Sequence, residues 1–500
     1  MFDLMISGFY EFFNLESFLY MNLGLFLGIV FGSIPGLTVM LCLVLFLPIT
    51  YSLNAIHSFM FLLGIYCAGS YGGSISAILI KTPGTPHAAA TMMDGHPLAM
   101  RGQAQKALNV ALYASFAGGI ISALVLLFLA PEVAKIAMKM GSPEYFLICA
   151  FGLTIIAGVS GDSLLKGIIS GCLGLFLSFI GIDLMSGDTM RFTFDNLNLY
   201  SGFDLVVVLI GLFALIEIIH KGQAVKKSEN NANSSAISLD KGTLSKSEWW
   251  RLPKPISIGS LSGILIGIIP GTGASIASFL SYDFSRKVSK KPEEFGNGSV
   301  EGIAAAESAN NAITGTALIP LLTLGIPGDA AVALMLGALM VNGLTPGPNL
   351  FTTHGTAVYA IMIGLIFVNI FMLIQGKYLL KLFVKVVKIP QVVLIPIIAI
   401  FCFAGAYSLK ENMFDVGAAI SFAAIAYVMD KFGFSAVPTL LGLVLGALTE
   451  KNLRRSLMIS DGDWSIFIER PISLALCILI LGVIISIIYT NYKKSKAQRV

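Results

Sequence analysis

Charged side chains are scarce in this sequence. Asp, Glu, Lys and Arg together make up 12% of its 500 residues, about half of the ~25% that is usual in soluble globular proteins. Hydrophobic residues account for 56%, and the mean hydropathy is +0.84. This composition excludes an ordinary soluble domain. The net charge of +4 says little by itself, because the distribution of Lys and Arg matters more. We expect no nucleic-acid partner.

Motifs for metal binding, redox chemistry and ATP hydrolysis are also missing. The five histidines form no HExxH pair, and no GxxxxGK[ST] loop occurs, which excludes an ATP-driven pump that depends on that loop. The six cysteines show no CxxC spacing and stand within apolar runs, so we interpret them as buried small hydrophobes. They are Cys42, Cys67, Cys149, Cys172, Cys402 and Cys477. We therefore expect neither an enzyme nor a resident cofactor.

In place of charge, the sequence has a succession of apolar runs. A helix needs about 20 predominantly apolar residues to cross the hydrocarbon core of a membrane. Runs near that length recur along the whole chain, for example Ala111–Ala130, Phe203–Ile219, Ala357–Ile374 and Pro471–Tyr489. The N-terminal segment MFDLMISGFYEFFNLESF is acidic and lacks the basic start of a cleavable signal. The sequence predicts an all-α polytopic membrane protein without such a signal.

Glycine and proline interrupt these runs at matching places in two halves of the chain. GIVFGSIPGLT (Gly28–Thr38) opens the first half, and GILIGIIPGTG (Gly263–Gly273) opens the second. A second break follows in each half, at Pro83-Gly84 and at Pro327-Gly328. Two breaks in the same order predict an internal repeat. The residues that match at one constant offset are Gly28, Gly32, Pro35 and Gly36 in the first half and Gly263, Gly267, Pro270 and Gly271 in the second.

A polar stretch separates the two halves. Residues 221–254 are rich in Ser, Asn and Lys, which is typical of a linker. Trp249 and Trp250 near its end suit the headgroup level of a membrane. We therefore assign residues 1–220 to a first membrane repeat, 221–254 to a cytoplasmic linker, 255–450 to a second membrane repeat, and 451–500 to a polar loop, a terminal transmembrane helix and a basic cytoplasmic tail.

The charge distribution predicts that the two repeats have inverted topology. The linker and the tail NYKKSKAQRV are basic and should be cytoplasmic, whereas the first 16 residues carry acidic and no basic side chains. Arg101 and Lys106 follow the second break of the first half, but the equivalent loop Asn342–Gly355 has neither Lys nor Arg. The first half should therefore begin outside the cell and the second half inside.

The first break of each half is predicted to be the tip of a re-entrant hairpin. In the second half, Arg251 and Lys254 precede the break and four basic residues at 286–291 follow it, so a single span would place one basic cluster outside. We expect hairpin tips at Ser33–Gly36 and Ile269–Gly273. A remaining basic group falls outside in this scheme and does not fit it: Lys451, Arg454 and Arg455.

Inverted repeats with broken helices are the architecture of secondary transporters, whose substrate site lies near the midplane between the repeats. The start of a half-helix offers free N–H groups and a positive dipole end to an anion. Glycine lets a ligand approach the backbone, and Ser and Thr add donors. We therefore predict that an anionic substrate binds at the breaks, or, alternatively, that Gly and Pro there only permit kinks and close helix packing. The candidate residues are Ser33, Pro35, Gly36, Thr38, Gly72, Gly73, Ser74, Lys81, Pro83, Gly84, Thr85, Pro270, Gly271, Thr272, Gly273, Pro327, Gly328 and Asp329.

The segment ESANNAITGT (Glu307–Thr316) before the last break supplies amide and hydroxyl oxygens. A hard cation such as sodium prefers oxygen ligands, so Asn310, Asn311 and Thr314 are candidates for binding a coupling sodium ion. An interhelical hydrogen bond is the alternative role for the two Asn residues. Glu307 itself needs a partner, because an acidic group within the membrane is costly without one.

Two charged residues at the breaks are each open to two interpretations. Asp329 follows Pro-Gly directly, so it is either a ligand or, as we favour, the N-cap of the next helix. Lys81 stands two positions before Pro83. Its charge either faces the cavity and pairs with a carboxylate or, as we favour, snorkels to the headgroups on its long stem.

At these motifs the sequence resembles the large membrane subunit of tripartite tricarboxylate transporters. The resemblance covers nearly the whole chain, including the linker. It is carried by GxxxGxxPG at 28–36, by YGGSISAIL (Tyr71–Leu79), by TPGTPHAAATMMDGHPLAMRGQA (Thr82–Ala104), by the stretch from GIIPGTGASIASF to AAAESANNA at 267–312, and by LIPLLTLGIPGD (Leu318–Asp329).

The resemblance implies a permease of the bacterial inner membrane that takes up tricarboxylates such as citrate, or related carboxylates, with an ion gradient, usually sodium. A periplasmic solute-binding protein would deliver substrate, and a small four-helix membrane subunit would complete the assembly. Uptake of another organic anion, a passive anion channel and an intramembrane protease are the alternatives. The protease is disfavoured, because Asp283 begins a charged loop and residue 326 is Ile, so no GxGD pattern surrounds Asp329.

Overall fold

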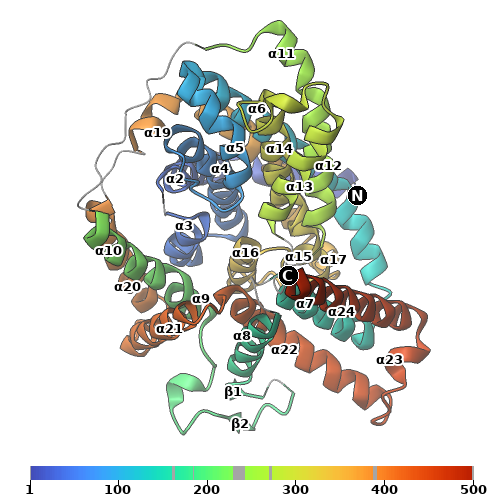
Figure 1. The fold of residues 1–500 in the computed structure, drawn as a ribbon. Helices are drawn as coiled ribbons and strands as arrows, with labels where there is room; N and C mark the ends of the chain where they lie inside the picture. The colour runs from blue at the N-terminus through green and yellow to red at the C-terminus, as the bar shows by residue number, and fades with distance from the viewer. Residues whose placement is uncertain are drawn as a thin grey trace.

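The computed structural model describes residues 2–35, 37–159, 164–183, 185–228, 242–269, 273–386 and 391–497. In this part the chain is almost entirely helical (Figure 1), which confirms the all-α prediction. Among the described residues, five helical segments are long and apolar enough to cross a membrane. They are Leu15–Ser33, Ala55–Ile80, Ala88–Ala137, Gly355–Tyr378 and Met413–Lys431.

The first half contains ten α-helices and one small sheet among its described residues. The helices are α1 (Phe2–Phe12), α2 (Leu15–Ser33), α3 (Val39–Phe46), α4 (Ala55–Ile80), α5 (Ala88–Leu98), α6 (Ala104–Ala137), α7 (Ser142–Val159), α8 (Leu164–Ser178), α9 (Leu205–Leu209) and α10 (Ile216–Ser228). Shorter turns of helix are η1 (Leu47–Ser52), η2 (Ala99–Gln103), η3 (Leu197–Leu199) and η4 (Ile210–Leu215). Strands β1 (Gly181–Ile182) and β2 (Met190–Arg191) pair antiparallel, with Gly181 opposite Arg191.

The remaining helices belong to the linker and the second half. They are α11 (Lys246–Arg251), α12 (Pro253–Gly267), α13 (Ala274–Val288), η5 (Pro292–Glu294), α14 (Val300–Thr316), α15 (Leu318–Leu324), α16 (Ala330–Val341), α17 (Leu350–Thr353), α18 (Gly355–Tyr378), α19 (Leu380–Val386), α20 (Gln391–Ser408), α21 (Met413–Lys431), α22 (Ala436–Ile459), α23 (Ile466–Glu469) and α24 (Pro471–Ala497). The sequence predicted a polar loop from residue 451. The first part of this prediction is wrong, because α22 continues to Ile459.

Helices end at all four predicted breaks. Residues 34–38 separate α2 from α3, and residues 268–273 separate α12 from α13. Residues 81–87 separate α4 from α5, and residues 325–329 separate α15 from α16. Four candidate site residues at these breaks, Gly36, Pro270, Gly271 and Thr272, lie outside the described residues.

Polar caps and positive φ angles fix where the helices begin and end. The Thr38 hydroxyl accepts the backbone N–H of Leu41 at 3.1 Å and caps α3. The Asp329 carboxylate accepts the N–H of Val332 at 2.8 Å, which confirms the capping role favoured from the sequence. At the other ends, α4 stops at Lys81 in the left-handed region (φ 55°) and α15 at Gly325 (φ 75°).

Glycine stripes bring α2 against α4 and α12 against α14. A Cβ atom on Gly28 would lie 2.5 Å from the carbonyl oxygen of Ile65, and one on Gly263 would lie 2.5 Å from that of Ala309. Such distances leave no room for a side chain, so these helices meet backbone to backbone, as small residues allow in membrane proteins. One turn later, Gly32 is equally close to the backbone oxygen of Gly69, whereas Gly267 faces the side chain of Thr316.

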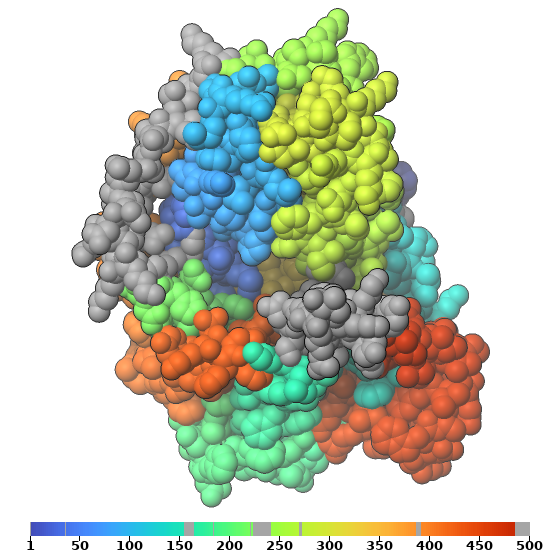
Figure 2. All heavy atoms as spheres, in the orientation of Figure 1, coloured from blue at the N-terminus to red at the C-terminus, as the bar shows by residue number. Residues whose placement is uncertain are grey.

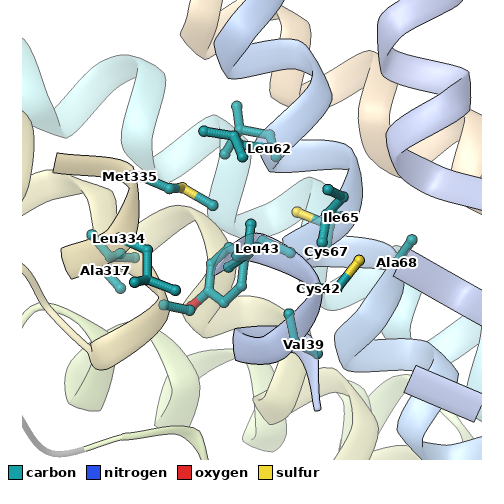
Figure 3. Close-up of a cluster of buried hydrophobic side chains, with 14 of the residues drawn as sticks. Val39, Cys42, Leu43, Leu62, Ile65, Cys67, Ala68, Ala317, Leu334 and Met335 are labelled. Carbon is teal, nitrogen blue, oxygen red and sulfur yellow. The ribbon is translucent and has the colours of Figure 1, made fainter. Parts of the chain in front are cut away.

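Side chains from both halves share one core. In Figure 3, Cys42 and Leu43 of α3 and Leu62 and Ile65 of α4 lie near Met335 of α16. The halves also meet at the surface, where α5 contacts α13 and α14 and residues near 100 (light blue) adjoin residues near 290 (yellow-green) in Figure 2. The halves are therefore packed together rather than connected by the linker alone.

The cysteines are free in the described structure. Cys42, Cys67, Cys149 and Cys402 are buried, as the sequence predicted. The interpretation is wrong for Cys172, which is exposed.

Candidate functional site

The described helix breaks open onto a shared cavity of about 560 Å³ between the two halves. Thr38 and Val39 at the start of α3 and Thr85 and His87 just before α5 line it from the first half. The first turn of a helix has N–H groups without intrahelical acceptors. Here Thr38 accepts the Leu41 N–H, and the N–H groups of Ala88 and Ala89 donate to the oxygens of Thr85 and Pro86, so only some of these backbone donors remain available at the cavity.

The second half lines the opposite side with the equivalent segments. Gly273 and Ala274 at the start of α13 and Asp329 and Ala330 at the start of α16 border the same cavity. Gly273 has φ 74°, and among the described residues, its chain neighbours aside, no atom lies within 4 Å of the position a Cβ would take. Its backbone is therefore open to a ligand, as the sequence argument for glycine requires.

Helices α4 and α14 form the polar wall between these two sides. Tyr66 and Ser70 of α4 and Asn310 of α14 line the cavity. The Asn310 Nδ2 donates to the backbone oxygen of Ser70 at 3.1 Å, which is the interhelical hydrogen bond considered from the sequence. Its Oδ1 has no hydrogen-bond partner within the described part of the chain, so an oxygen acceptor remains available there.

Tyr66 also reaches the start of α16. Its hydroxyl donates to Asp329 Oδ2, while Oδ1 of the same carboxylate caps α16. Asp329 therefore has both roles considered from the sequence: it is a helix cap, and it borders the cavity. Both its oxygens are engaged by donors from the protein.

The cavity suits an anion bound by neutral donors. Its described lining contains no Lys or Arg, so the available groups are backbone N–H groups, hydroxyls and one imidazole. The Nε2 of His87 is buried and has no hydrogen-bond partner among the residues that the structure describes. Helix starts that converge on one point are an established way to hold an anionic group, and His87 supplies a further donor or acceptor.

The structure separates the predicted site residues into groups. Thr38, Thr85, Gly273, Asn310 and Asp329 line the cavity. Others serve helix packing: a Cβ on Gly84 would lie 1.9 Å from the Gly32 oxygen, and one on Gly328 would lie 2.7 Å from Ala317 Cα. The packing group also includes Gly72 and Gly73, because Cβ atoms on these residues would clash with Ile29 and Thr85. Neither of them lines the cavity, and neither do Pro83 and Pro327, which directly precede Gly84 and Gly328.

The other predicted residues lie away from the cavity lining. Ser33 donates to the Val30 oxygen at 3.0 Å within α2, and Thr314 donates to the Asn311 oxygen at 2.7 Å. Pro35, two residues after Ser33, is not part of the lining. Asn311 is fully buried, and its side-chain amide has no partner. Ser74 donates to Glu307. Lys81 is exposed at the end of α4 and is not part of the lining.

Sequence reasoning missed Tyr66, Ser70, His87 and Ser435, which all line the cavity. The spacing Tyr66–Ser70–Ser74 puts polar groups on one face of α4 at intervals of one turn, and this signal was available. His87 stands within the motif TPGTPHAAATMMDG at the second break of the first half. Ser435, the N-cap of α22, follows no Pro-Gly break, and only the packing of α22 brings it here.

Comparison with known proteins gives one family and two relatives. The model of the tripartite tricarboxylate transporter TctA family matches residues 18–441. An uncharacterized 52.8 kDa protein in the TAR-I ttuC′ 3′ region of Agrobacterium vitis is 37% identical over 453 residues, which cover 91% of this chain and 89% of that protein. An uncharacterized protein in the TAR-II ttuC′ 3′ region of the same organism is 41% identical over 236 residues, 47% of this chain and 98% of that protein. No solved structure matches the chain.

Proposed function

The chain belongs to the tripartite tricarboxylate transporter TctA family, and on that premise we propose that it is the large membrane subunit of a secondary transporter. In this proposal it takes up tricarboxylates such as citrate, or related carboxylates, across the bacterial inner membrane. The observation that carries the proposal is the cavity between the halves at which α3, α5, α13 and α16 begin.

The chemistry of this cavity supports a carboxylate as the substrate. Backbone N–H groups at helix starts stabilise a negative group without a counter-charge on the protein. Thr85 and His87 on one side and Gly273 and Ser275 on the other offer donors at opposite walls. Two such walls suit a molecule that carries more than one carboxylate.

We further propose sodium as the coupling ion. Asn310 lines the cavity, and its buried Oδ1 has no hydrogen-bond partner among the described residues; the side-chain amide of Asn311, the next residue on α14, has none there either. Oxygen ligands of this kind suit a hard cation, and broken-helix transporters bind their coupling ions beside the substrate. Binding of the cation would offset the charge of the incoming carboxylate.

Two separate polypeptides complete the proposed system. A periplasmic solute-binding protein would deliver the carboxylate, and a small four-helix membrane subunit would accompany this chain. A tripartite family implies further components.

Repeats of inverted topology are the proposed basis of transport. Three contacts between helices each have an equivalent related by the repeat. The contact of α2 with α4 corresponds to that of α12 with α14, the contact of α3 with α16 to that of α13 with α5, and the contact of α6 with α14 to that of α18 with α4. The last two of these relations cross between the halves. Such an exchange of equivalent contacts supports two related units around a central site.

Uptake tests the proposed function. The cognate binding protein is first screened by thermal shift against di- and tricarboxylates, and the best ligand, radiolabelled, is then offered to vesicles that contain this chain, the small subunit and the binding protein. We expect saturable accumulation that needs the binding protein and an inward sodium gradient. Flux without saturation would indicate a channel, and no flux of any carboxylate would contradict the proposal.

Cysteine labelling tests the inverted topology. Single cysteines at residues 101–106 and 342–355 should react with an impermeant reagent from opposite sides of the membrane, with residues 342–355 accessible from outside. Labelling of both loops from the same side would rule out inverted repeats while leaving the uptake result unaffected.

A further inference from the structure

Glu307 is the central residue of a buried polar cluster behind the cavity. Its side chain lies on α14 and is fully buried. Ser74 of α4 and Thr91 of α5 both donate to Oε1, and Ser115 of α6 donates to Oε2 at 2.8 Å. One carboxylate of the second half is thus surrounded by three hydroxyls of the first half.

The groups that surround the Glu307 carboxylate differ from those around two other fully buried acids, Glu144 and Asp94. Glu144 lies 2.7 Å from the Arg470 guanidinium, and Asp94 accepts the backbone N–H groups of Gly298 and Ser299 at 2.9 Å. Within the described residues Glu307 has no Lys, Arg or His partner. Hydroxyls supply hydrogen bonds but no positive charge, and an ionised carboxylate within a membrane protein requires a partner.

The cluster lies directly behind the cavity wall. Ser70 and Asn310 line the cavity and are hydrogen-bonded to each other. Ser74 lies one helical turn after Ser70 on α4, and Glu307 lies one turn before Asn310 on α14. The Ser74–Glu307 contact is therefore the neighbour of the Ser70–Asn310 contact along the same helix pair. A small ion that enters through the cavity therefore reaches the carboxylate by passing the free Asn310 Oδ1.

We propose that Glu307, the hydroxyls of Ser74, Thr91 and Ser115, and the Asn310 amide oxygen form a binding site for one monovalent cation. The inference rests on the proposed function, in which this cation is the sodium ion coupled to carboxylate uptake, and it assigns the charged ligand of that site to Glu307.

The charge and the donor set define the class of ion. The site has a single negative charge, so a monovalent cation neutralises it and a divalent one does not. All the ligands are oxygens, which suit a hard cation, and a hydroxyl can rotate so that a lone pair faces the ion. Because the ligands come from both halves, binding of the cation joins α14 to α4, α5 and α6.

The test measures sodium binding by the purified chain rather than transport. Thermal stability is recorded against rising NaCl, with choline chloride at equal ionic strength as reference, for wild type, Glu307→Gln and Ser115→Ala. We expect sodium to stabilise the wild type. We expect Glu307→Gln to raise the half-maximal sodium concentration about tenfold or more, because the attraction between opposite charges is lost. Without sodium it should be at least as stable as wild type, since an uncompensated charge is removed.

Two buried residues provide matched controls. Ser122 lies on α6 like Ser115 but donates only to backbone oxygens, so Ser122→Ala should leave the sodium response unchanged, whereas Ser115→Ala should weaken it severalfold. Glu144→Gln should lower stability through the loss of the Arg470 ion pair and keep the sodium response. If Glu307→Gln does not fold, the two serine variants decide the matter.

Several results would overturn the inference. The first is a sodium response that is unchanged in Glu307→Gln. The second is an equal effect of Ser115→Ala and Ser122→Ala on the sodium response. The third is a thermal stabilisation of wild type that depends on pH and is the same in sodium and in choline. Vesicle uptake separates this failure from that of the proposed function. Sodium-dependent uptake that persists unchanged in Glu307→Gln refutes only the inference, whereas wild type without carboxylate uptake refutes the function itself.

Discussion

The hydroxyl of Tyr66 on α4 donates a hydrogen bond to the carboxylate of Asp329 at the start of α16, a residue 263 positions later in the chain. This contact joins the two halves at the wall of the cavity, and both residues line it. It keeps an acidic side chain engaged in a place where the proposed substrate is itself an anion.

Removing the Tyr66 hydroxyl should impair substrate binding. In Tyr66→Phe, Asp329 still caps α16 but loses its donor within the cavity, a change that costs about 1–3 kcal/mol for a buried acceptor. We expect lower thermal stability and a KM for carboxylate uptake raised by about tenfold, the equivalent of about 1.4 kcal/mol. Tyr71→Phe is the control, because the Tyr71 hydroxyl is buried without a partner; a KM as high in this variant would contradict the role of Tyr66.

His87 rather than Lys81 should affect the recognition of the anion. The sequence left open whether Lys81 meets the substrate, but its side chain is exposed away from the lining, whereas the free Nε2 of His87 is buried at the cavity. We expect His87→Ala to raise KM for uptake by about three- to tenfold, the loss of about one hydrogen bond, and Lys81→Gln to leave it near wild type. The reverse ranking of the two variants would show that Lys81 reaches the substrate.

Glycines at the breaks should differ in their response to alanine. A Cβ on Gly84 would lie 1.9 Å from the Gly32 oxygen, whereas Gly273 has open space around it but a positive φ. We therefore expect Gly84→Ala to prevent recovery of folded protein after extraction from the membrane. Gly273→Ala should fold with a stability loss of about 1–2 kcal/mol from the left-handed backbone. Size-exclusion profiles and melting curves measure both, and equal recovery of the two variants would mean that the helices do not pack as closely as described.

The turn between β1 and β2 should keep its structure in acid. The backbone N–H of Met185 and the Arg454 guanidinium lower the pKa of Asp183, and Arg191 adds to the effect. Because the folded pKa lies below the unfolded value of about 3.9, the stabilising contribution is present above that pH and is lost as pH falls below it. Hydrogen exchange at residues 181–191 should be protected and constant from pH 7 to about pH 4.

Asp183→Asn provides the comparison for this prediction. It removes the charge that pairs with Arg454 and Arg191. Protection of the turn from hydrogen exchange should therefore be lower than in wild type at neutral pH, and it should not decrease further in acid. Protection that is the same in both proteins at all pH values would show that the carboxylate does not hold this turn.

One member of the basic group that did not fit the predicted topology, Arg454, forms ion pairs. Arg454 lies 2.7 Å from Asp183 and 3.2 Å from Glu450. Its charge is thus balanced by acids from α22 and from the turn after β1. A count of basic residues along the sequence does not include such partners.

The positions of the helix breaks were determined by local sequence. Proline lacks an N–H group and clashes with the preceding turn, and α4 and α15 end shortly before Pro83 and Pro327. Proline alone is not sufficient, because Pro97, Pro131 and Pro396 lie inside helices. Asp329 caps α16 because a short acidic side chain accepts N–H groups of the next turn. The recurrence of glycines at a constant offset likewise indicated that equivalent helices in the two halves pack closely.

What each residue contacts was decided only by the tertiary structure. Sequence treated Gly84 and Gly273 alike, yet one is pressed against a neighbouring backbone and the other borders the cavity. Tyr66, His87 and Ser435 join the lining through the crossing of α4, α5 and α22, and Glu307 finds its three hydroxyls on helices of the other half. Local backbone sterics act over a few residues and can be read along the chain, whereas the partners of a buried polar group depend on which helices meet, and that is settled by packing over hundreds of residues.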